Sequence, residues 1–366
     1  MIDKLSAKKI KVLHVRSTIG MYGAEQVLLN VLPVLNNFCE ASLLTLETVL
    51  GDSATLRTLL SDLGVDTHGF IPKGRVDRQV IKSIEEQIKT AEFNVIHTHD
   101  YKSLFYVYST LKTLNIPIVH HIHGSLGNTI SEKVYAVIEK LMMRKVSRVL
   151  TVSQEQKKNI ETDLFTYPEI KQVNNGTVVS SMPESNKPNL DILNLIMVAR
   201  FTEEKNHLLA IDMVEKLKNL NVPVILNLLG SGPLMAVIEE IINVRNLKDC
   251  INLVGFTRDV TAWLDRSDIL LITSTTEGMP LNMLEGMERG LPIISTAVGE
   301  IPRLIREANC GSTYSTIGEL IKLVMDIRNN RTSWNELGLL GREYVKENLS
   351  VEQQARSLYL EYVGLV

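Results

Sequence analysis

The sequence predicts an α/β protein of two domains, each built on a parallel sheet covered by helices. The chain has 366 residues, more than one hydrophobic core usually serves, so its length favours two domains. In both halves, apolar runs of strand length alternate with segments of helical period, which is typical of βαβ units. Glycine turns follow several of these strands. We therefore expect two Rossmann-like domains facing each other across a cleft, with the site at the carboxyl ends of the strands.

The N-terminal half begins with a predicted strand over residues 10–15. A loop containing Gly20 and Gly23 follows, and then a helix over residues 24–35 with apolar residues at helical spacing. A helix that opens directly after a glycine loop presents free backbone N–H groups to an anion. Gly20 and Gly23 are therefore candidate phosphate contacts, although two glycines three apart are weak support because turns need them anyway.

Histidines are concentrated in the same half, with six of the eight between His68 and His123. Two predicted strands end in such residues, one running into His97, His99 and Asp100 and the next into His121 and His123. Imidazole clusters bind zinc, so a metal site is one interpretation. These histidines are paired at i, i+2 and have no cysteines nearby, so we expect core or surface positions and no metal.

A basic helix is predicted over residues 131–148. Its apolar residues fall on one side, and its basic residues are Lys133, Lys140, Arg144, Lys145 and Arg148. A solvated face is the ordinary interpretation of such a pattern, and docking on anionic lipid is the alternative.

Residues 180–191 contain two prolines and few apolar residues, which is typical of a linker. We therefore predict domains over residues 1–183 and 184–366. The second begins with a strand over residues 193–199 that leads to Arg200 and Lys205. The strand over residues 224–229 leads to Gly230, and the strand from residue 251 ends at Gly255 and Phe256.

The richest pattern follows an apolar run at residues 268–273. A turn comes next with Glu277, then Gly278, which should relax the backbone, and Met279. Pro280 stands where a first helical residue is favoured, Leu281 and Glu285 belong to the helix, and Gly290 ends it. The helix amino terminus makes an anion site, with carboxylates at two depths, so a nucleotide sugar would fit. The alternative is that Glu277 and Glu285 are solvated residues that favour the helix dipole.

Ser274, Glu277-Gly278-Met279-Pro280-Leu281, Glu285 and Gly290-Leu291-Pro292-Ile293-Ile294 together resemble the signature of the family-4 retaining glycosyltransferases of the GT-B fold. That signature is a Ser, an EGxxL turn, a second Glu eight residues after the first, and a GxPVI strand. The resemblance extends to most of the chain, through Gln172 to Gly176, through Arg200 and Lys205, and through the Gly230-Ser231-Gly232-Pro233 turn.

The resemblance implies transfer of a hexosyl unit from a UDP- or GDP-sugar to a hydroxyl of a glycan or lipid-linked acceptor, with retention. It implies that His123 and Glu277 address the donor sugar, and that Arg200, Lys205 and residues 278–281 neutralise the diphosphate. Glu285 would hold the ribose, the strand end at Gly255 and Phe256 would meet the base, and His99 and Asp100 would lie on the acceptor side. The last helix, about residues 351–366, would cross back to the first domain. Departures from the family pattern stand at Tyr22, Ala199, Glu300 and Arg303.

Composition limits the other functions. A net charge of −3 argues against a nucleic-acid binder, and three scattered cysteines favour a reducing compartment. The first nine residues lack the apolar core of a signal peptide, so we expect a cytoplasmic protein, with peripheral membrane contact as an alternative. No Asp-x-Asp pair occurs, so we expect catalysis without a metal or other cofactor. A GT-B-fold nucleotide-sugar epimerase and a non-catalytic sugar-nucleotide-binding protein stay open. A dinucleotide oxidoreductase lacks its GxGxxG turn here.

Overall fold

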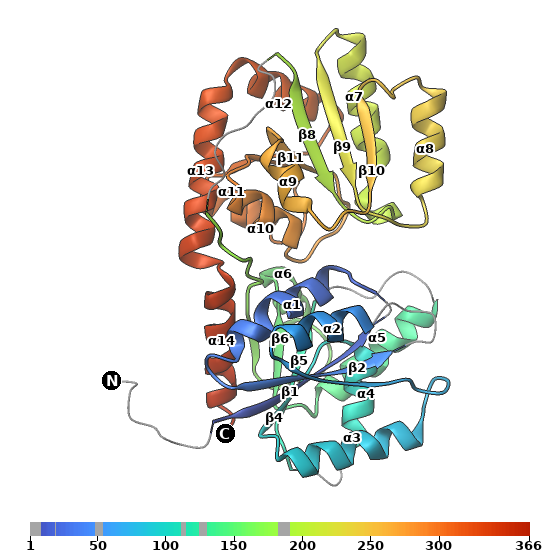
Figure 1. Cartoon of the computed structure of the whole chain (residues 1–366), viewed down its shortest axis with the longest axis vertical. Helices are drawn as coiled ribbons and strands as arrows, with labels where there is room; N and C mark the ends of the chain where they lie inside the picture. The colour runs from blue at the N-terminus through green and yellow to red at the C-terminus, as the bar shows by residue number, and fades with distance from the viewer. Residues whose placement is uncertain (1–8, 19, 48–53, 111–114, 124–129, 182–190) are drawn as a thin grey trace. The chain divides into compact units, whose positions relative to one another are not determined.

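The computed structural model describes residues 9–18, 20–47, 54–110, 115–123, 130–181 and 191–366. The chain divides into two compact units, one formed by Met1–Gly176 with Val351–Val366 and the other by Thr177–Ser350. The domain boundary expected at residues 183 and 184 lies outside the described residues, as does most of the expected linker. Figure 1 shows the elements of each unit.

The N-terminal unit has a seven-stranded parallel sheet in the order β3-β2-β1-β4-β5-β6-β7. The strands are β1 (Lys11–Thr18), β2 (Glu40–Glu47), β3 (Asp66–Phe70), β4 (Val95–Thr98), β5 (Ile118–Ile122), β6 (Arg148–Thr151) and β7 (Ile170–Gln172). The helices are α1 (Gly23–Leu35), α2 (Ala54–Asp62), α3 (Arg78–Ala91), α4 (Tyr101–Tyr108), α5 (Ile130–Met143), α6 (Gln154–Glu161) and α14 (Val351–Val363).

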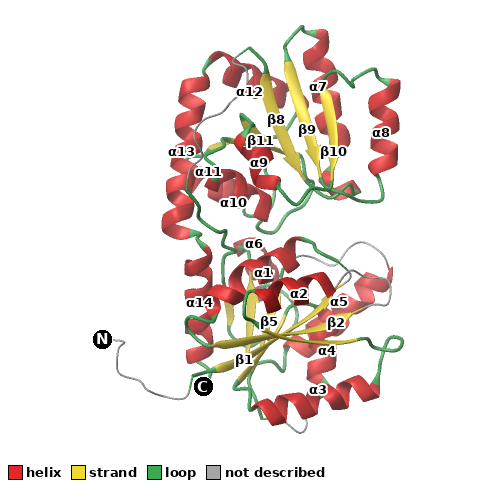
Figure 2. Cartoon of the chain, viewed as in Figure 1, coloured by secondary structure: helices red, strands yellow, loops and turns green. Residues whose placement is uncertain are grey.

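The C-terminal unit has a six-stranded parallel sheet in the order β10-β9-β8-β11-β12-β13. Its strands, in yellow in Figure 2, are β8 (Leu193–Val198), β9 (Val224–Leu229), β10 (Ile251–Gly255), β11 (Ile269–Ile272), β12 (Ile293–Thr296) and β13 (Gly311–Tyr314). Its helices are η1 (Glu203–Lys205), α7 (His207–Asn219), α8 (Met235–Val244), α9 (Val260–Asp265), α10 (Leu281–Glu288), α11 (Ile301–Ala308), α12 (Ile317–Asn329) and α13 (Arg331–Asn348).

Both strand orders confirm the prediction of two Rossmann-like domains, because each order reverses once around the unit's first strand. The alternation of side chains along β1 places Val12 in one buried cluster and Leu13 and Val15 in another, one on each face of the sheet. Val351, Ala355, Leu358 and Tyr362 of α14 belong to the cluster that holds Val12. The C-terminal helix is thus part of the N-terminal unit's core.

Two predicted bounds are wrong. The first strand continues to Thr18, because the whole of Lys11–Thr18 pairs with Glu40–Glu47 of β2. The basic helix ends at Met143 and does not reach Arg148, which lies in β6 and forms ion pairs with Glu169 and Glu361. Pairing of the following segment with β5 stops the helix, and the Ser147 N–H already donates to the Ile118 carbonyl at 2.8 Å.

Candidate functional site

The predicted anion site lies where the strand order of the C-terminal sheet reverses, between β8 and β11. Loops that follow these two strands open at the same sheet edge, which is where open α/β sheets bind ligands. The loops are tied together by the Thr275 N–H, which donates to the Glu204 carbonyl at 2.8 Å, and by the Thr273 hydroxyl, which donates to the Lys205 carbonyl at 2.8 Å.

Lys205 and Glu277, predicted separately, form one contact. The Lys205 Nζ lies 2.6 Å from Glu277 Oε1, and the Ser274 hydroxyl donates to the same oxygen at 2.6 Å. Both side chains are largely shielded, with 20% of Lys205 and 9% of Glu277 exposed. A charged pair held at low exposure is a preorganised group that an entering anion can engage.

The Arg200 side chain is more exposed than that of Lys205. Its Nη2 lies 3.1 Å from Glu204 Oε1, and about half of its side chain is exposed. The Thr202 hydroxyl donates to the same Glu204 oxygen at 2.6 Å, which holds the carboxylate. Arg200 is thus a half-exposed cation at the start of the loop, whereas Lys205 is largely shielded within it.

The turn into α10 differs from its prediction in two details. Pro280 is the N-cap in an extended conformation, and the helix begins at Leu281. Gly278 is not among the residues with a positive φ; the left-handed residue is Gly299 at φ +56°, where a Cβ would lie 2.1 Å from the Glu277 carbonyl oxygen. The Glu300 N–H donates to the Gly278 carbonyl at 3.0 Å. The turn is therefore held from the β12–α11 loop, which a single-residue pattern around Gly278 does not reveal.

The amino terminus of α10 has no side-chain cap, and its first turn contains no acidic residue. The Asn282 amide donates to the Val198 carbonyl at 2.7 Å and fixes this turn against the end of β8. At the far end, Gly290 has φ +71°, as predicted for a residue that ends a helix. The amino terminus is thus an uncapped positive dipole end beside Lys205.

Glu285 lies on α10 and is half-buried. Burial, together with the smaller effect of the neighbouring Glu288 charge, raises the pKa of its carboxyl group from 4.5 to about 7. Glu288 itself is paired with Arg342 at 2.8 Å, whereas no ion pair of Glu285 occurs among the described residues. A half-buried carboxylate of this kind is suited to accept hydrogen bonds from ligand hydroxyls.

The glycine turn after β9 permits close backbone contact. Gly230 has φ +133°, and a Cβ there would lie 1.9 Å from the Ala199 carbonyl oxygen. A Cβ at Gly232, which was not among the predicted site residues, would lie 2.6 Å from the Phe201 carbonyl oxygen. Gly255 has φ +76°, and the Phe256 side chain that follows is 66% exposed. An exposed aromatic ring at a strand end can stack on a planar ligand.

Glu300, the N-cap residue of α11, forms an ion pair with Arg303 of that helix, and Arg303 also contacts Glu307 at 2.6 Å. Glu300 is 2% exposed. The two departures from the family pattern are therefore coupled, because each charge is neutralised by the other within one helical turn.

The corresponding opening of the N-terminal unit is occupied by its own carboxylate. Glu25 is buried and accepts a hydrogen bond from the Tyr22 N–H at 3.2 Å and from Arg16 Nε at 2.9 Å. The Tyr22 ring lies against Gly20, 3.3 Å from where a Cβ would stand, and Gly23 is the first residue of α1. Phosphate contact by Gly20 and Gly23 stays a prediction, and nothing at this end of α1 favours it.

His99, Asp100 and His123 lie close together at the ends of β4 and β5. His99 Nδ1 is 2.9 Å from His123 Nε2. Asp100 caps α4 by accepting from the Lys102 and Ser103 N–H groups at 2.9 Å, and it also accepts from the Ser17 hydroxyl at 2.7 Å. Burial lowers the pKa of His99 and of His123 well below the ordinary value, so both are neutral at pH 7. Asp100 thus has a structural task that the sequence prediction did not include.

The sequence predicts two histidine pairs on separate strands, and the structure gathers five histidines. His14, His97 and His99 form one group and His99, His121 and His123 another, each close enough to share an ion. Several of the facing nitrogens are engaged in hydrogen bonds with one another. His14 was missed altogether. The available signal was the period of two, which places histidines on one face of three neighbouring strands.

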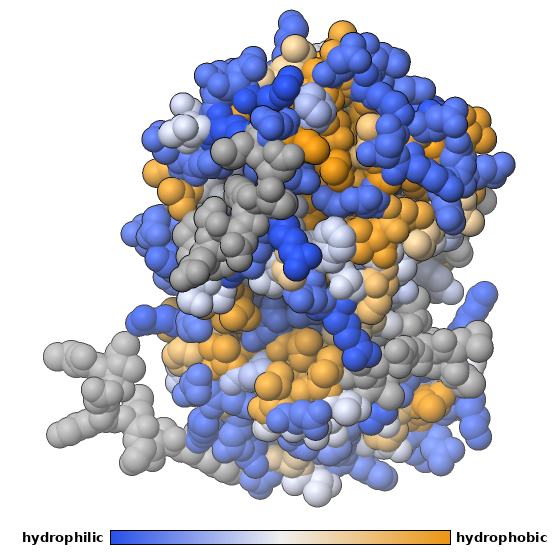
Figure 3. Space-filling model, turned by 45° about the horizontal axis from the view of Figure 1, so that its top comes forward, coloured by the Kyte–Doolittle hydropathy of each residue, from blue (hydrophilic) through white to orange (hydrophobic). Residues whose placement is uncertain are grey.

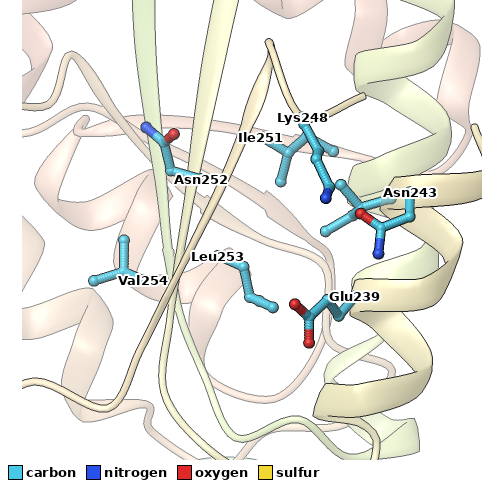
Figure 4. A pocket seen from close by; sticks show the side chains of 8 residues that line it. Glu239, Asn243, Lys248, Ile251, Asn252, Leu253 and Val254 are labelled. Atoms are coloured by element: carbon cyan, nitrogen blue, oxygen red, sulfur yellow. The ribbon is translucent and has the colours of Figure 1, made fainter. Parts of the chain in front are cut away.

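A surface hollow of about 310 Å³ lies elsewhere in the C-terminal unit, between α8 and β10. Figure 4 shows Glu239, Asn243 and Lys248 on one side of it and Leu253 on the other. It flanks an edge strand and has none of the predicted site residues, so we do not assign it to the candidate site.

Two family models match the chain and together span most of it. "Glycosyltransferase Family 4" matches residues 23–180, and "Glycosyl transferases group 1" matches residues 180–338. In solved structures, the chain is similar to Anabaena Alr3699/HepE in complex with UDP, with a TM-score of 0.82 at 16% identity over 97% of this chain and 100% of that one. This likeness confirms the GT-B fold.

Several relatives in sequence are named as glycosyltransferases, some of them of polysaccharide biosynthesis. The chain is 26% identical over 316 residues to the UDP-Gal:alpha-D-GlcNAc-diphosphoundecaprenol alpha-1,3-galactosyltransferase of Escherichia coli, covering 80% of each. It is 36% identical over 121 residues to the amylovoran biosynthesis glycosyltransferase AmsK of Erwinia amylovora, covering 31% of this chain and 30% of AmsK. Several relatives, AmsK among them, are thus matched over only about a third of their own length.

Proposed function

Because this chain belongs to the family-4 glycosyltransferases of the GT-B fold, we propose that it transfers a hexosyl unit from a UDP-sugar to a hydroxyl of a glycan or lipid-linked acceptor, with retention at the anomeric carbon. The observation that carries this proposal is the Lys205–Glu277 pair beside the uncapped amino terminus of α10. It provides two charges of opposite sign at one anion site.

The pair can exchange partners when a donor binds. A diphosphate carries more negative charge than one carboxylate, so Lys205 would move its hydrogen bond to the phosphate. Glu277 would then be released to accept from a hydroxyl of the donor sugar. As the glycosidic bond breaks, charge builds on the leaving diphosphate, and Lys205 with the helix dipole stabilises it.

The other predicted site residues would each contact one part of the donor or the acceptor. Glu285 would accept from the ribose hydroxyls, and the exposed Phe256 with Gly255 would border the base. Arg200 would close over the phosphates from the loop entrance. His123 would contact the donor sugar, and His99 with Asp100 would lie on the acceptor side.

Uridine is the base we favour over guanosine. The galactosyltransferase relative is named for UDP-Gal, and the Anabaena neighbour was solved with UDP. The named acceptor of the same relative is a diphosphoundecaprenol-linked sugar. A lipid-linked glycan is therefore the acceptor class to test first.

The proposed chemistry needs no metal, since Lys205, Arg200 and the α10 dipole would supply the positive charge. Activity should persist in EDTA. Complete loss in EDTA with recovery on adding Mg²⁺ or Mn²⁺ would show that the charge on the leaving group is neutralised differently.

The decisive experiment incubates the protein with UDP- and GDP-hexoses and a panel of polyprenyl-diphosphate sugars. We expect release of UDP with formation of an α-linked product, read by ¹H NMR of the anomeric proton. An inverted product would contradict retention, and preference for GDP-sugars would contradict the base. Interconversion of the free nucleotide sugar would support an epimerase, and binding without turnover a non-catalytic protein.

Contact with a membrane surface is a second part of the proposal. None of the described helices is long and apolar enough to span a bilayer. On α5, however, four apolar side chains are exposed rather than packed into the core: Val134, Val137, Ile138 and Leu141. Lys133 and Lys140 flank this stripe, and Arg144 and Lys145 follow the helix. Figure 3 shows hydrophobic residues, in orange, among hydrophilic ones, in blue, on the face that it views.

Apolar residues flanked by cations suit an anionic lipid surface. Co-sedimentation with vesicles containing anionic lipid should fall with added salt and on neutralising Lys140, Arg144 and Lys145. Neutralising Lys157 and Lys158 on α6 is the matched control. Equal loss in both variants, or no binding by the wild type, would remove this part of the proposal.

A further inference from the structure

The histidines of the N-terminal unit lie on one face of three neighbouring strands. Parallel pairing sets His14 of β1 beside His97 of β4, and the alternation of side chains brings His99 and His121 to the same face one step further along. His123 follows at the end of β5. His14, His97, His99 and His121 are at most 3% exposed. Such a concentration of buried imidazoles at one sheet edge needs hydrogen-bond partners.

Four of these rings and one tyrosine form a continuous hydrogen-bonded chain. His123 Nε2 lies 2.9 Å from His99 Nδ1, and His99 Nε2 lies 2.9 Å from His14 Nδ1. His14 Nε2 is 3.4 Å from the Tyr362 hydroxyl, which is 2.6 Å from His97 Nδ1. Every ring uses its Nδ1 toward one neighbour and its Nε2 toward the other, except at the two ends.

Burial makes these rings neutral. The pKa of His14 falls to about 3, and the pKa values of His97, His99 and His123 fall well below the ordinary value, in each case mainly because burial disfavours the charged form. A neutral imidazole has one N–H donor and one acceptor nitrogen. Every link needs one of each. With the Tyr362 hydroxyl donating its proton in one of its two links, the chain has two consistent arrangements, with all rings protonated at Nε2 or all at Nδ1.

The distances at Tyr362 favour the first arrangement. A hydroxyl donor gives shorter bonds than a ring N–H donor, and 2.6 Å to His97 Nδ1 fits a donating O–H. Tyr362 has one proton, so its oxygen accepts from His14 Nε2 in the longer contact of 3.4 Å. His14 Nδ1 then accepts from His99 Nε2, and His99 Nδ1 accepts from His123 Nε2.

We propose that this chain, anchored by Tyr362 on α14, holds His123 in the Nε2–H tautomer and leaves its Nδ1 as a hydrogen-bond acceptor for a donor-sugar hydroxyl. Tyr362, His14 and His99 are positioning residues in this scheme. The contact between His123 Nδ1 and a donor-sugar hydroxyl rests on the proposed function, whereas the tautomer is a property of the protein alone. Nδ1 of His123 has no partner among the described residues, and the orphaned nitrogen of the chain, His97 Nε2, lies at its far end.

The arrangement is stable against local change, because one ring cannot reverse alone. A reversed His99 would set two donors face to face at one link and two acceptors at the other, so all four links must reverse together. The C-terminal helix thereby influences the histidine at the end of β5 through hydrogen bonds within one unit. The remaining histidine of the group, His121, stacks on His97, lies tilted against His123, and is not part of the chain.

The tautomers can be read directly from ligand-free protein. Long-range ¹H–¹⁵N spectra of ¹⁵N-histidine-labelled protein distinguish protonated from bare ring nitrogens, and single substitutions assign the eight histidines. We expect His14, His97, His99 and His123 all protonated at Nε2. A His123 protonated at Nδ1, or different tautomers at His99 and His123, overturns the proposal. So does one zinc ion per chain with His99 and His123 as ligands.

Tyr362→Phe tests the anchor. The variant should leave His123 in a mixture of tautomers. We expect kcat to fall roughly tenfold, which corresponds to the loss of about one hydrogen bond, while UDP affinity stays within twofold. Tyr359→Phe, on the same helix but packed against Phe38, is the control and should change neither. An unchanged His123 spectrum in folded Tyr362→Phe overturns the anchor. If Tyr362→Phe fails to fold, the wild-type spectrum still decides. The predicted tautomers without transferase activity would instead count against the proposed function alone.

Discussion

The β1–α1 and β11–α10 segments have the same plan, a buried strand, a turn with glycine and a helix, yet only one leaves its helix amino terminus open. In β1–α1, Glu25 folds back to accept from the Tyr22 N–H and pairs with Arg16. In β11–α10, the N-cap residue Pro280 makes no side-chain cap, the Met283 N–H donates to Asn282 Oδ1 at 2.8 Å, and the Glu277 carboxylate of the preceding turn is bound to Lys205. The first terminus holds a built-in anion, and the second has a cation beside it.

This difference shows that a strand, glycine loop and helix do not by themselves make a phosphate site. The helix dipole favours any anion, and a carboxylate of the chain satisfies it as well as a ligand does. Whether the site is open depends on one acidic residue in the first turn, present at Glu25 and absent from α10. The donor diphosphate is therefore expected at α10, and the predictions below test that assignment.

Lys205→Ala should have the largest effect. It removes the fixed cation and leaves Glu277 close to the developing charge of the leaving group, so we expect kcat to fall roughly 10²–10³-fold, as for other preorganised groups. Steady-state kinetics with a UDP-sugar would measure it. Lys322→Ala on α12, an exposed lysine, is the control, and Arg200→Ala should cost less because that side chain is half exposed. A kcat within fivefold of wild type would place the diphosphate elsewhere.

Glu285→Gln should separate binding from stability. Loss of the carboxylate weakens UDP binding by about 1.5–3 kcal/mol, measurable by calorimetry. The folded-state pKa is raised, so the free protein keeps a proton that the unfolded chain releases between pH 4.5 and about 7. Wild-type stability therefore falls as pH rises through this window, and the variant should be about 1–3 kcal/mol more stable at pH 8 but equal to wild type near pH 4.5.

Wild-type UDP affinity should weaken as pH falls below about 7, because the protonated carboxyl offers a poorer acceptor. Urea denaturation at both pH values provides the stability comparison. Unchanged UDP affinity in Glu285→Gln would remove the ribose role, whatever the stability result.

The fold was readable from the sequence because apolar runs, helical periods and glycine turns recur with regular spacing in both halves. A local sequence pattern does not show which distant segment a given stretch will pair with. The helix predicted through residue 148 ends at Met143 because the following segment pairs with β5, an interaction with residues nearly thirty positions away. Local propensity has no information about that competition.

Glu277 and Glu285 stand out by type and spacing, and Lys205 by the family resemblance. The structure brings Lys205 and Glu277 into contact, and the ligand-binding roles of all three stay predictions. Gly299, which supports the Glu277 turn, and Tyr362, which links His14 to His97 in the histidine chain, lie far along the sequence from the residues they contact. Their roles depend on close approaches that no spacing rule encodes.

Glu25→Gln tests the closed terminus. The variant removes the charge that faces Arg16, whose other ion-pair partner among the described residues is Asp100, at 3.8 Å. We therefore expect a loss of about 1–3 kcal/mol in the free energy of unfolding, measured by urea denaturation. UDP affinity should stay within twofold. Glu40→Gln, in an exposed pair with Lys11, is the control and should change stability by less than about 0.5 kcal/mol. A clear gain in UDP affinity would mean that α1 is a phosphate site kept closed by Glu25.

Gly23→Ala should have the smallest effect. A Cβ at Gly23 meets no atom within 4 Å, and its φ is not left-handed, so alanine should favour the first turn of α1 by about 0.4–1 kcal/mol. Thermal denaturation would measure this gain, and kcat/KM should stay within twofold. Gly299→Ala is the contrasting control, since φ +56° and a Cβ 2.1 Å from the Glu277 oxygen force the turn to move, and it should lose both stability and activity. A stable Gly23→Ala variant with kcat/KM reduced more than tenfold would mean that the donor touches the Gly23 backbone. The open and closed termini would then share the diphosphate, and the comparison between them would fail.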